Sequence, residues 1–147
     1  MGRYMEDKNP INGKRRYYID TNVVIRYLLH DNEKHYREAQ YYFTEAKSGS
    51  IILIMIPEII HEIEYVLRKV YAFPRPQVSE FLEEIISTRY ITIKDSLLLQ
   101  QSIAVYRETA VDLADIFLYF KAKHDYATVL SFDKTDFRKI ERYAKKH

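Results

Sequence analysis

The chain has 147 residues, which is the length of one domain and enough to bury a core without disulfide or metal crosslinks. It contains no cysteine, which excludes disulfides, thiolate zinc sites and a cysteine nucleophile, and favours a reducing, cytoplasmic location. Hydrophobic residues at 47% beside charged residues at 30% predict a soluble globular protein, and a formal net charge of +2 is too small to indicate nucleic-acid binding by itself.

The first predicted change from strand to helix comes at Asp20. Residues 1–16 carry many charges and no apolar segment, so they are predicted to form a flexible N-terminal arm rather than a signal peptide. Residues 17–19 are β-formers that stop at Asp20, and apolar residues recur at helical spacing over residues 23–30. A strand is therefore expected to bring Asp20 to its own carboxyl end, where open α/β sheets bind ligands.

The rest of the chain alternates apolar runs of strand length with segments of helical spacing. Strands are predicted at residues 51–56, 90–93 and 128–131. Helices are predicted at residues 33–47, 57–70, 77–88, 96–107 and 112–124, and from residue 134 onward. Because parallel neighbouring strands need crossover connections, this alternation predicts an α/β fold, with a parallel sheet that carries helices on both faces.

Acidic residues fall at the strand-to-helix junctions or helix starts of this pattern. They are Asp20, Glu62, the pair Asp112 and Asp115, and Asp133. The carboxyl ends of parallel strands share one edge of a sheet, so these acids are expected to meet there. Carboxylates forced together repel one another unless a divalent cation neutralises them, and oxygen ligands suit Mg²⁺ or Mn²⁺. The pattern therefore predicts a metal site.

Each acid also has a purely structural interpretation. Asp20, Asp112 and Asp133 could each cap the helix that follows, because short acids are favoured at that position in any α/β protein. Glu62 is harder to explain in this way, since it lies beside the apolar stripe of its helix, whereas Glu64 is expected on the solvated face. The occurrence of acids on several separate elements favours the metal site over capping.

Four segments also carry a resemblance to a known family. They are DTNVVIRYL at residues 20–28, EIEYVL at 62–67, DLADIFL at 112–118 and SFD at 131–133. In this order and spacing they resemble the successive motifs of PIN-domain ribonucleases of the VapC toxin type. The resemblance implies a single three-layer PIN-like domain over residues 17–147, with a short parallel central sheet flanked by helices.

The resemblance also implies the residues of the active site. The catalytic and metal-binding acids would be Asp20, Glu62, Asp115 and Asp133, with Asp112 as an additional acid. Thr21, Asn22 and Ser131 match polar positions that would orient the carboxylates or bound waters. The expected cofactor is Mg²⁺ or Mn²⁺, and the expected reaction is hydrolysis of RNA phosphodiester bonds. Candidates for RNA contact are Arg26, Lys134 and Arg138, and a surface ion pair is the alternative for Arg26.

Partners follow from the same resemblance. It implies the toxin of a toxin–antitoxin pair, held by a small cognate antitoxin, and a homodimer. Aromatic residues clustered at positions 36–43 and 65–73 could supply the dimer surface or pack in the core instead. The sequence leaves open whether Asp136 approaches the site.

Other functions stay open on the sequence alone. A housekeeping PIN nuclease in RNA processing would carry the same residues, and so would a PIN fold kept only for binding. A phosphatase with an aspartyl nucleophile usually has a second acid two residues later, where Asn22 follows Asp20. A receiver-like domain with a phosphate-accepting acid pocket would need paired acids before its first helix, and Asp20 stands alone there.

Overall fold

The computed structural model of the protein describes residues 13–147. Its strands are β1 (Arg15–Tyr18), β2 (Ile51–Met55) and β3 (Ile91–Ile93). Its helices are α1 (Thr21–Leu29), α2 (Glu33–Lys47), α3 (Pro57–Tyr65), the π-helix η1 (Val66–Val70), α4 (Arg75–Ile86), α5 (Ser96–Glu108), α6 (Leu113–His124) and α7 (Lys134–Lys146). The flexible arm predicted for residues 1–16 lies mostly outside the described residues.

The strands form one parallel sheet in the order β1–β2–β3. Tyr18 pairs with Ile54 of β2, and Met55 of β2 pairs with Ile93 of β3. Leu53, Ile54 and Met55 of the central strand are all buried. A strand with neighbours on both edges and helices on its faces has to be apolar in this way. The predicted fold class, α/β with a short parallel sheet flanked by helices, is confirmed.

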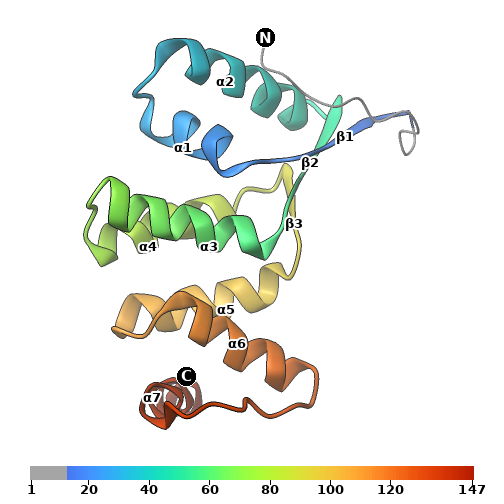
Figure 1. The fold of residues 1–147 in the computed structure, drawn as a ribbon. Coiled ribbons are helices and arrows are strands. Elements are labelled where there is room, and N and C mark those ends of the chain that lie inside the picture. The colour runs from blue at the N-terminus through green and yellow to red at the C-terminus, as the bar shows by residue number, and fades with distance from the viewer. Residues whose placement is uncertain (1–12) are drawn as a thin grey trace.

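The helices follow one another along the long axis of the molecule, and the strands lie along one side of its upper part (Figure 1). α1 packs against α2 and α3, and α2 also contacts β2. α4 packs on α5, α5 packs on α6, and α7 contacts both α5 and α6. The sheet therefore supports the N-terminal helices directly, whereas α6 and α7 are attached mainly through α5.

One apolar core runs through these layers. Its fully buried side chains, each at 0% exposure, include Met55 from β2, Ile63 from α3, Leu99 from α5, Ile116 from α6 and Ile140 from α7. Burying one such side chain favours folding by about 1.5–3 kcal/mol. Helices α6 and α7 thus belong to the same core as the sheet.

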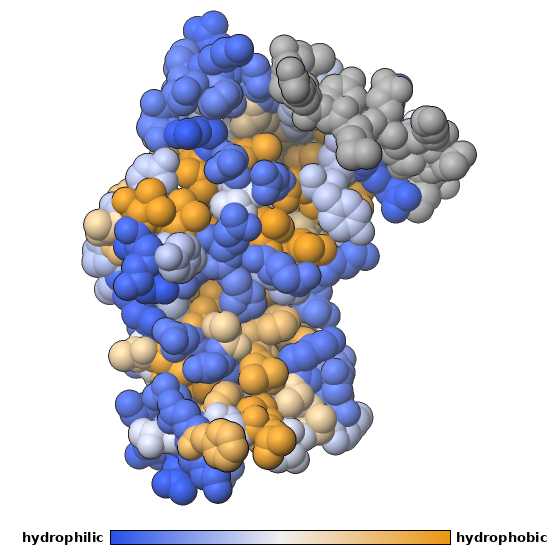
Figure 2. Space-filling view, viewed as in Figure 1, coloured by the Kyte–Doolittle hydropathy of each residue, from blue (hydrophilic) through white to orange (hydrophobic). Residues whose placement is uncertain are grey.

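The surface is mainly hydrophilic. Hydrophobic residues show between the helices and again over the lower part of the molecule, where α5, α6 and α7 lie (Figure 2). Leu97 of α5 and Leu118 of α6 are among the exposed large hydrophobic residues, at 66% and 48%. Within residues 13–147, no helix has both the length and the apolar character needed to cross a membrane.

Most predicted helices are confirmed to within a few residues. α2 has the predicted bounds, and Asn32 caps it by accepting a hydrogen bond from the His35 amide at 3.0 Å. β1 begins at Arg15, slightly before the predicted strand. The helix after β2 becomes a π-helix at Val66, whose carbonyl accepts from the Tyr71 amide at 3.1 Å. Such i→i+5 turns are rare and often lie near functional sites.

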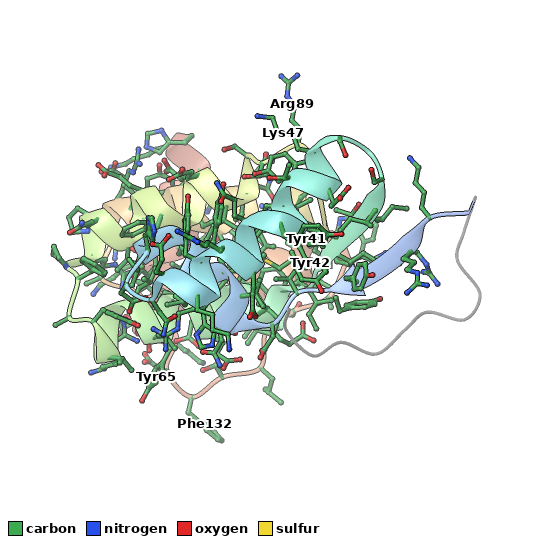
Figure 3. The ribbon with its side chains drawn as sticks, turned by 90° about the horizontal axis from the view of Figure 1, so that it is seen from above. Tyr41, Tyr42, Lys47, Tyr65, Arg89 and Phe132 are labelled. Atoms are coloured by element: carbon green, nitrogen blue, oxygen red, sulfur yellow. The ribbon has the colours of Figure 1, made fainter. Side chains whose placement is uncertain are left out.

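The strand predicted at residues 128–131 is wrong. This segment is irregular, and Leu130 and Phe132 are fully exposed, at 101% and 109%. Figure 3 shows the Phe132 side chain projecting away from the body of the molecule. A run of β-formers becomes a strand where a neighbour completes its hydrogen bonds and apolar surface covers its side chains. Within residues 13–147 the segment has no strand partner, so Asp133 does not follow a sheet strand.

Candidate active site

Asp20 lies at the turn from the first strand into α1. The amide of Ile19 still belongs to the sheet, since it donates to the Ile54 carbonyl at 2.9 Å. Asp20 has the extended backbone of a helix cap, and its Oδ1 accepts from the Thr21 amide at 2.8 Å. The residue is exposed. Its carboxylate is therefore positioned as a cap and is also accessible to a ligand.

The two polar residues after Asp20 have different surroundings. Thr21 is 2% exposed, and its buried hydroxyl has no hydrogen-bond partner within the described chain. Leaving such a group unpaired costs about 1–3 kcal/mol, so it favours a site where a water or ligand atom binds. Asn22 is exposed. Together with Asp20 and Arg26 it lines a cleft of about 740 Å³ beside β1, α1 and α2.

The acids of the C-terminal helices stand at their first turns. Asp112 and Asp133 occupy the N-cap positions of α6 and α7, but neither carboxylate makes a capping hydrogen bond. Asp115 lies in the first turn of α6. The hydroxyl of Ser131 accepts from the Asp133 amide at 3.1 Å, so it orients the backbone of Asp133 rather than its carboxylate. Capping therefore does not explain why Asp112 and Asp133 are acids.

Asp115 has the most perturbed environment of these acids. Burial raises its pKa, and the charges of Asp112, Asp136 and Asp133 raise it further. The two helices that carry these acids, α6 and α7, are in contact. Asp112 and Asp115 stand at the start of α6 and Asp133 and Asp136 at the start of α7, and Asp136 also lies 3.9 Å from the Lys139 ammonium.

Glu64 does not lie as the helical pattern predicted. Glu62 is exposed, whereas Glu64, expected on the solvated face, is 6% exposed. The prediction for Glu64 is wrong because two donors from the protein satisfy its carboxylate. The Tyr106 hydroxyl donates to Oε2 at 2.8 Å, and Arg68 Nε donates to the same oxygen at 2.6 Å. The arginine placed four residues after the acid is a sequence signal for the ion pair, but not for the burial.

His61 connects the helix of Glu62 with the helix of Asp115. Its ring lies edge-on to the Phe117 ring of α6, with centroids 5.3 Å apart, and its Nδ1 lies 2.7 Å from the Pro57 carbonyl oxygen. Its Nε2 is buried without a hydrogen-bond partner in the part of the chain that the structure describes. α3 and α6 are therefore in contact close to two of the predicted acids.

The predicted acids lie on separate elements. Asp112, Asp115 and Asp133 stand at the starts of α6 and α7, whereas Asp20 caps α1 and Glu62 lies on α3. Across residues 13–147, no group of three or more acidic, histidine or cysteine side chains is arranged to hold a metal ion. The four-acid centre stays a prediction, and the segment before Asp133 lies outside the sheet that was expected to deliver it.

The basic residues predicted to contact RNA differ in their surroundings. Arg26 Nη1 lies 2.9 Å from Asp31 Oδ2, and the Tyr71 hydroxyl donates to the same oxygen at 3.1 Å. The hydrogen bond to Asp31 raises the pKa of Arg26 and lowers that of Asp31. Arg26 therefore forms the surface ion pair that was its alternative. Lys134 and Arg138 are exposed on α7, near Asp133 and Asp136.

These features define a class of protein: an α/β domain with a parallel sheet and acids at the starts of the helices that surround it. The chain belongs to the PIN domain family, whose model matches residues 17–143. PIN domains are generally nucleases that depend on a divalent metal, usually Mg²⁺ or Mn²⁺. Comparison with curated proteins and with solved structures gave no match.

The chemistry of these residues suits a divalent cation of this kind, although across residues 13–147 their side chains do not form a group that could hold one. The donors are carboxylate oxygens, which Mg²⁺ and Mn²⁺ prefer. The charges of the neighbouring acids raise the pKa of Asp115, and a cation would relieve that repulsion. Beside Asp20, Thr21 has a buried hydroxyl oxygen with no hydrogen-bond partner within residues 13–147.

Proposed function

We propose that this protein is a metal-dependent endoribonuclease that hydrolyses RNA phosphodiester bonds. The observation that carries the proposal is the group of carboxylates around Asp115 in a chain of the PIN domain family. Several carboxylates held close together are difficult to keep ionised without a cation. A nuclease uses such acids to hold the metal ion that it needs for catalysis. A purely structural domain would gain no stability from carboxylates that repel one another.

In the proposed site each acid has the role that the family motifs imply. The metal-holding acids are Asp20, Glu62, Asp115 and Asp133, with Asp112 as an additional acid. Bound Mg²⁺ or Mn²⁺ supplies a water of lowered pKa and neutralises charge on the phosphate. Thr21 and Asn22 orient the acids and bound waters, and Ser131 holds the backbone of Asp133. An acidic pocket repels RNA, so we assign the phosphate contacts to the exposed cations Lys134 and Arg138 on α7.

The proposal is tested by incubating the full chain with structured and single-stranded RNAs in the presence of Mg²⁺, Mn²⁺ or EDTA. The decisive variant is Asp115→Asn. Its matched control is Asp125→Asn, at the other end of α6, where the exposed carboxylate lies 3.9 Å from the Lys121 ammonium. The wild type and the control should cleave RNA, and chelation or Asp115→Asn should abolish cleavage. Cleavage that survives both treatments would show that another site or mechanism is responsible.

We further propose that this nuclease is the toxin of a toxin–antitoxin pair, because its four acid-bearing segments resemble those of VapC-type toxins. The cleft beside Asp20 is a surface that a small antitoxin could cover. Expression of the wild type alone should arrest growth, and Asp115→Asn should not. A small protein encoded next to the gene should co-purify and restore growth. Harmless expression of the active enzyme would favour a housekeeping nuclease instead.

A homodimer is the remaining part of this proposal. Tyr41 and Tyr65, one from each of the aromatic clusters, are 46% and 55% exposed, whereas Phe43 is buried in the core. The exposed rings are therefore available for a contact between subunits, and the buried one is not. Sedimentation of the purified chain should give the mass of two copies, and a monomer at high concentration would contradict the dimer.

A further inference from the structure

We propose that Arg75 is a positioning residue for the acid-bearing start of α6, and that Glu64 and Tyr106 hold Arg75 in place. These side chains link α3, α4 and α5 to the peptide immediately before Asp112. The catalytic consequence of this inference rests on the proposed nuclease function. Its structural consequence can be measured separately.

Arg75 joins three parts of the chain through one guanidinium group. It is the first residue of α4. Its Nε donates to the Tyr106 carbonyl at 3.0 Å, and its Nη2 donates to the Val111 carbonyl. The guanidinium also lies over the Tyr106 ring, with Cζ 3.6 Å from the centroid. Because its donors have a rigid planar arrangement, the two carbonyls are fixed relative to each other.

The Tyr106 ring is itself held from the other side. Tyr106 is fully buried, and its hydroxyl donates to Glu64 Oε2 at 2.8 Å. Arg68 donates to both oxygens of Glu64, from Nε at 2.6 Å and from Nη2 at 3.3 Å. Buried polar groups that are all paired in this way make a rigid network. Since Glu64 lies two residues after Glu62, the network also reaches the helix of another predicted acid.

The network acts on the backbone that leads into α6. Val111 is 1% exposed, and its carbonyl accepts from Arg75. The Val111 amide donates to the Thr109 hydroxyl at 3.3 Å. The backbone carbonyl and the backbone amide of Val111 are therefore both held by hydrogen bonds. Asp112 follows directly and makes no capping hydrogen bond with its side chain. The orientation of Asp112, and of Asp115 one turn later, is therefore set by the backbone that Arg75 holds.

A second arginine provides a comparison, because its contact also connects two helices. Arg107 of α5 forms an ion pair with Glu83 of α4, so it joins the same two helices. The two side chains are 43% and 41% exposed. Exposed pairs of this kind contribute little to stability. Arg107→Gln is therefore the matched control for Arg75→Gln.

The test measures amide hydrogen exchange together with RNA cleavage, in Arg75→Gln, Arg75→Lys and Arg107→Gln. Arg75→Gln should accelerate exchange at residues 111–116 by about tenfold and leave β2 unchanged, since one buried contact to this segment is lost. It should lower kcat by about 100-fold, with KM within about twofold, because misplaced acids slow the chemical step. Arg75→Lys should recover part of both effects, since lysine can still donate to one carbonyl. Arg107→Gln should change neither.

The outcomes separate the two proposals. Exchange at residues 111–116 that is unchanged in Arg75→Gln would overturn the positioning role. A uniform acceleration across β2 and α6, with kcat per folded molecule unchanged, would do the same. If the wild type shows no metal-dependent cleavage, the nuclease proposal fails and the exchange data still decide the role of Arg75. If Arg75→Gln does not fold, Tyr106→Phe removes only the hydroxyl, and unchanged exchange in that variant would likewise overturn the inference.

Discussion

Replacing Asp115 by asparagine should make the metal-free protein more stable at neutral pH. Burial and three neighbouring carboxylates raise the pKa of Asp115 above its ordinary value. A raised pKa means that the native state binds the proton more tightly than the unfolded chain, so ionisation of Asp115 weakens the fold. The protonated Asp115 carboxyl makes its full favourable contribution to stability below the unfolded pKa of about 3.9, and this contribution is lost as the pH rises through the raised native pKa.

The size of the effect follows from two opposing interactions. Repulsion between like charges three residues apart on one helix, as for Asp112 and Asp115, costs about 0.2–0.5 kcal/mol. The charges of Asp133 and Asp136 and the burial of Asp115 add to this cost. The first turn of α6 favours an acid by about 0.3–1 kcal/mol through the helix dipole. Because the pKa of Asp115 is raised, the combined cost of charge repulsion and burial must exceed the favourable effect of the helix dipole. We expect a net gain of about 0.5–1 kcal/mol, or roughly 1–4 °C in Tm.

Thermal unfolding followed by circular dichroism, with EDTA present, measures this gain. Asp115→Asn should unfold at a higher temperature than the wild type at pH 7, and the difference should vanish near pH 3.5, where about half or more of ordinary carboxyls are protonated. Asp125→Asn should show no gain. Added Mg²⁺ should stabilise the wild type more than the variant, since ligand binding favours the native state. A variant that is less stable at pH 7, or a gain that persists at pH 3.5, would refute the reasoning.

Three further predictions test the fold itself. In urea denaturation, Ile116→Ala should lower the free energy of unfolding by about 2–5 kcal/mol because it leaves a cavity at a fully buried position. Leu118→Ala, at a 48% exposed position of the same helix, should change the free energy of unfolding by no more than about 0.5 kcal/mol. Ala72 has a left-handed backbone with φ 57°, so Ala72→Gly should raise the free energy of unfolding by about 0.5–1 kcal/mol. This value is the backbone strain that glycine relieves, minus the cost of the greater flexibility that glycine gives the unfolded chain. Phe132→Ser should change it by less than about 0.5 kcal/mol because the ring is fully exposed, and a larger loss would show that Phe132 is buried.

The elements that the sequence predicted well are those with local determinants. α2 has a cap at Asn32 and a turn at Gly49, where φ is +86°, so its bounds follow from neighbouring residues. β2 is a continuous apolar run bounded by Ser50 and Pro57, which suits a central strand. The order of strands and helices then determines the parallel sheet. The fold class could therefore be read from patterns within short windows.

The features that the sequence did not predict depend on distant partners. Glu64 is buried because of Tyr106, which lies 42 residues further along the chain, and the helical pattern around Glu64 contains no information about that contact. The run at residues 128–131 has the composition of a strand, but strand formation requires a neighbouring strand, which composition does not reveal. Asp136 approaches Asp115 because α7 packs on α6, and this packing depends on Ile140.

The strand β1 leads directly to Asp20, and this has a consequence for how the proposed nuclease would lose activity. Asp20 is attached to a hydrogen-bonded ladder, whereas α6 and α7 are attached by side-chain packing around Ile116 and Ile140. Regions held by fewer backbone hydrogen bonds to the rest of a protein open first under mild denaturation. Inactivation by denaturant should therefore precede the loss of the sheet, and the two midpoints should not coincide.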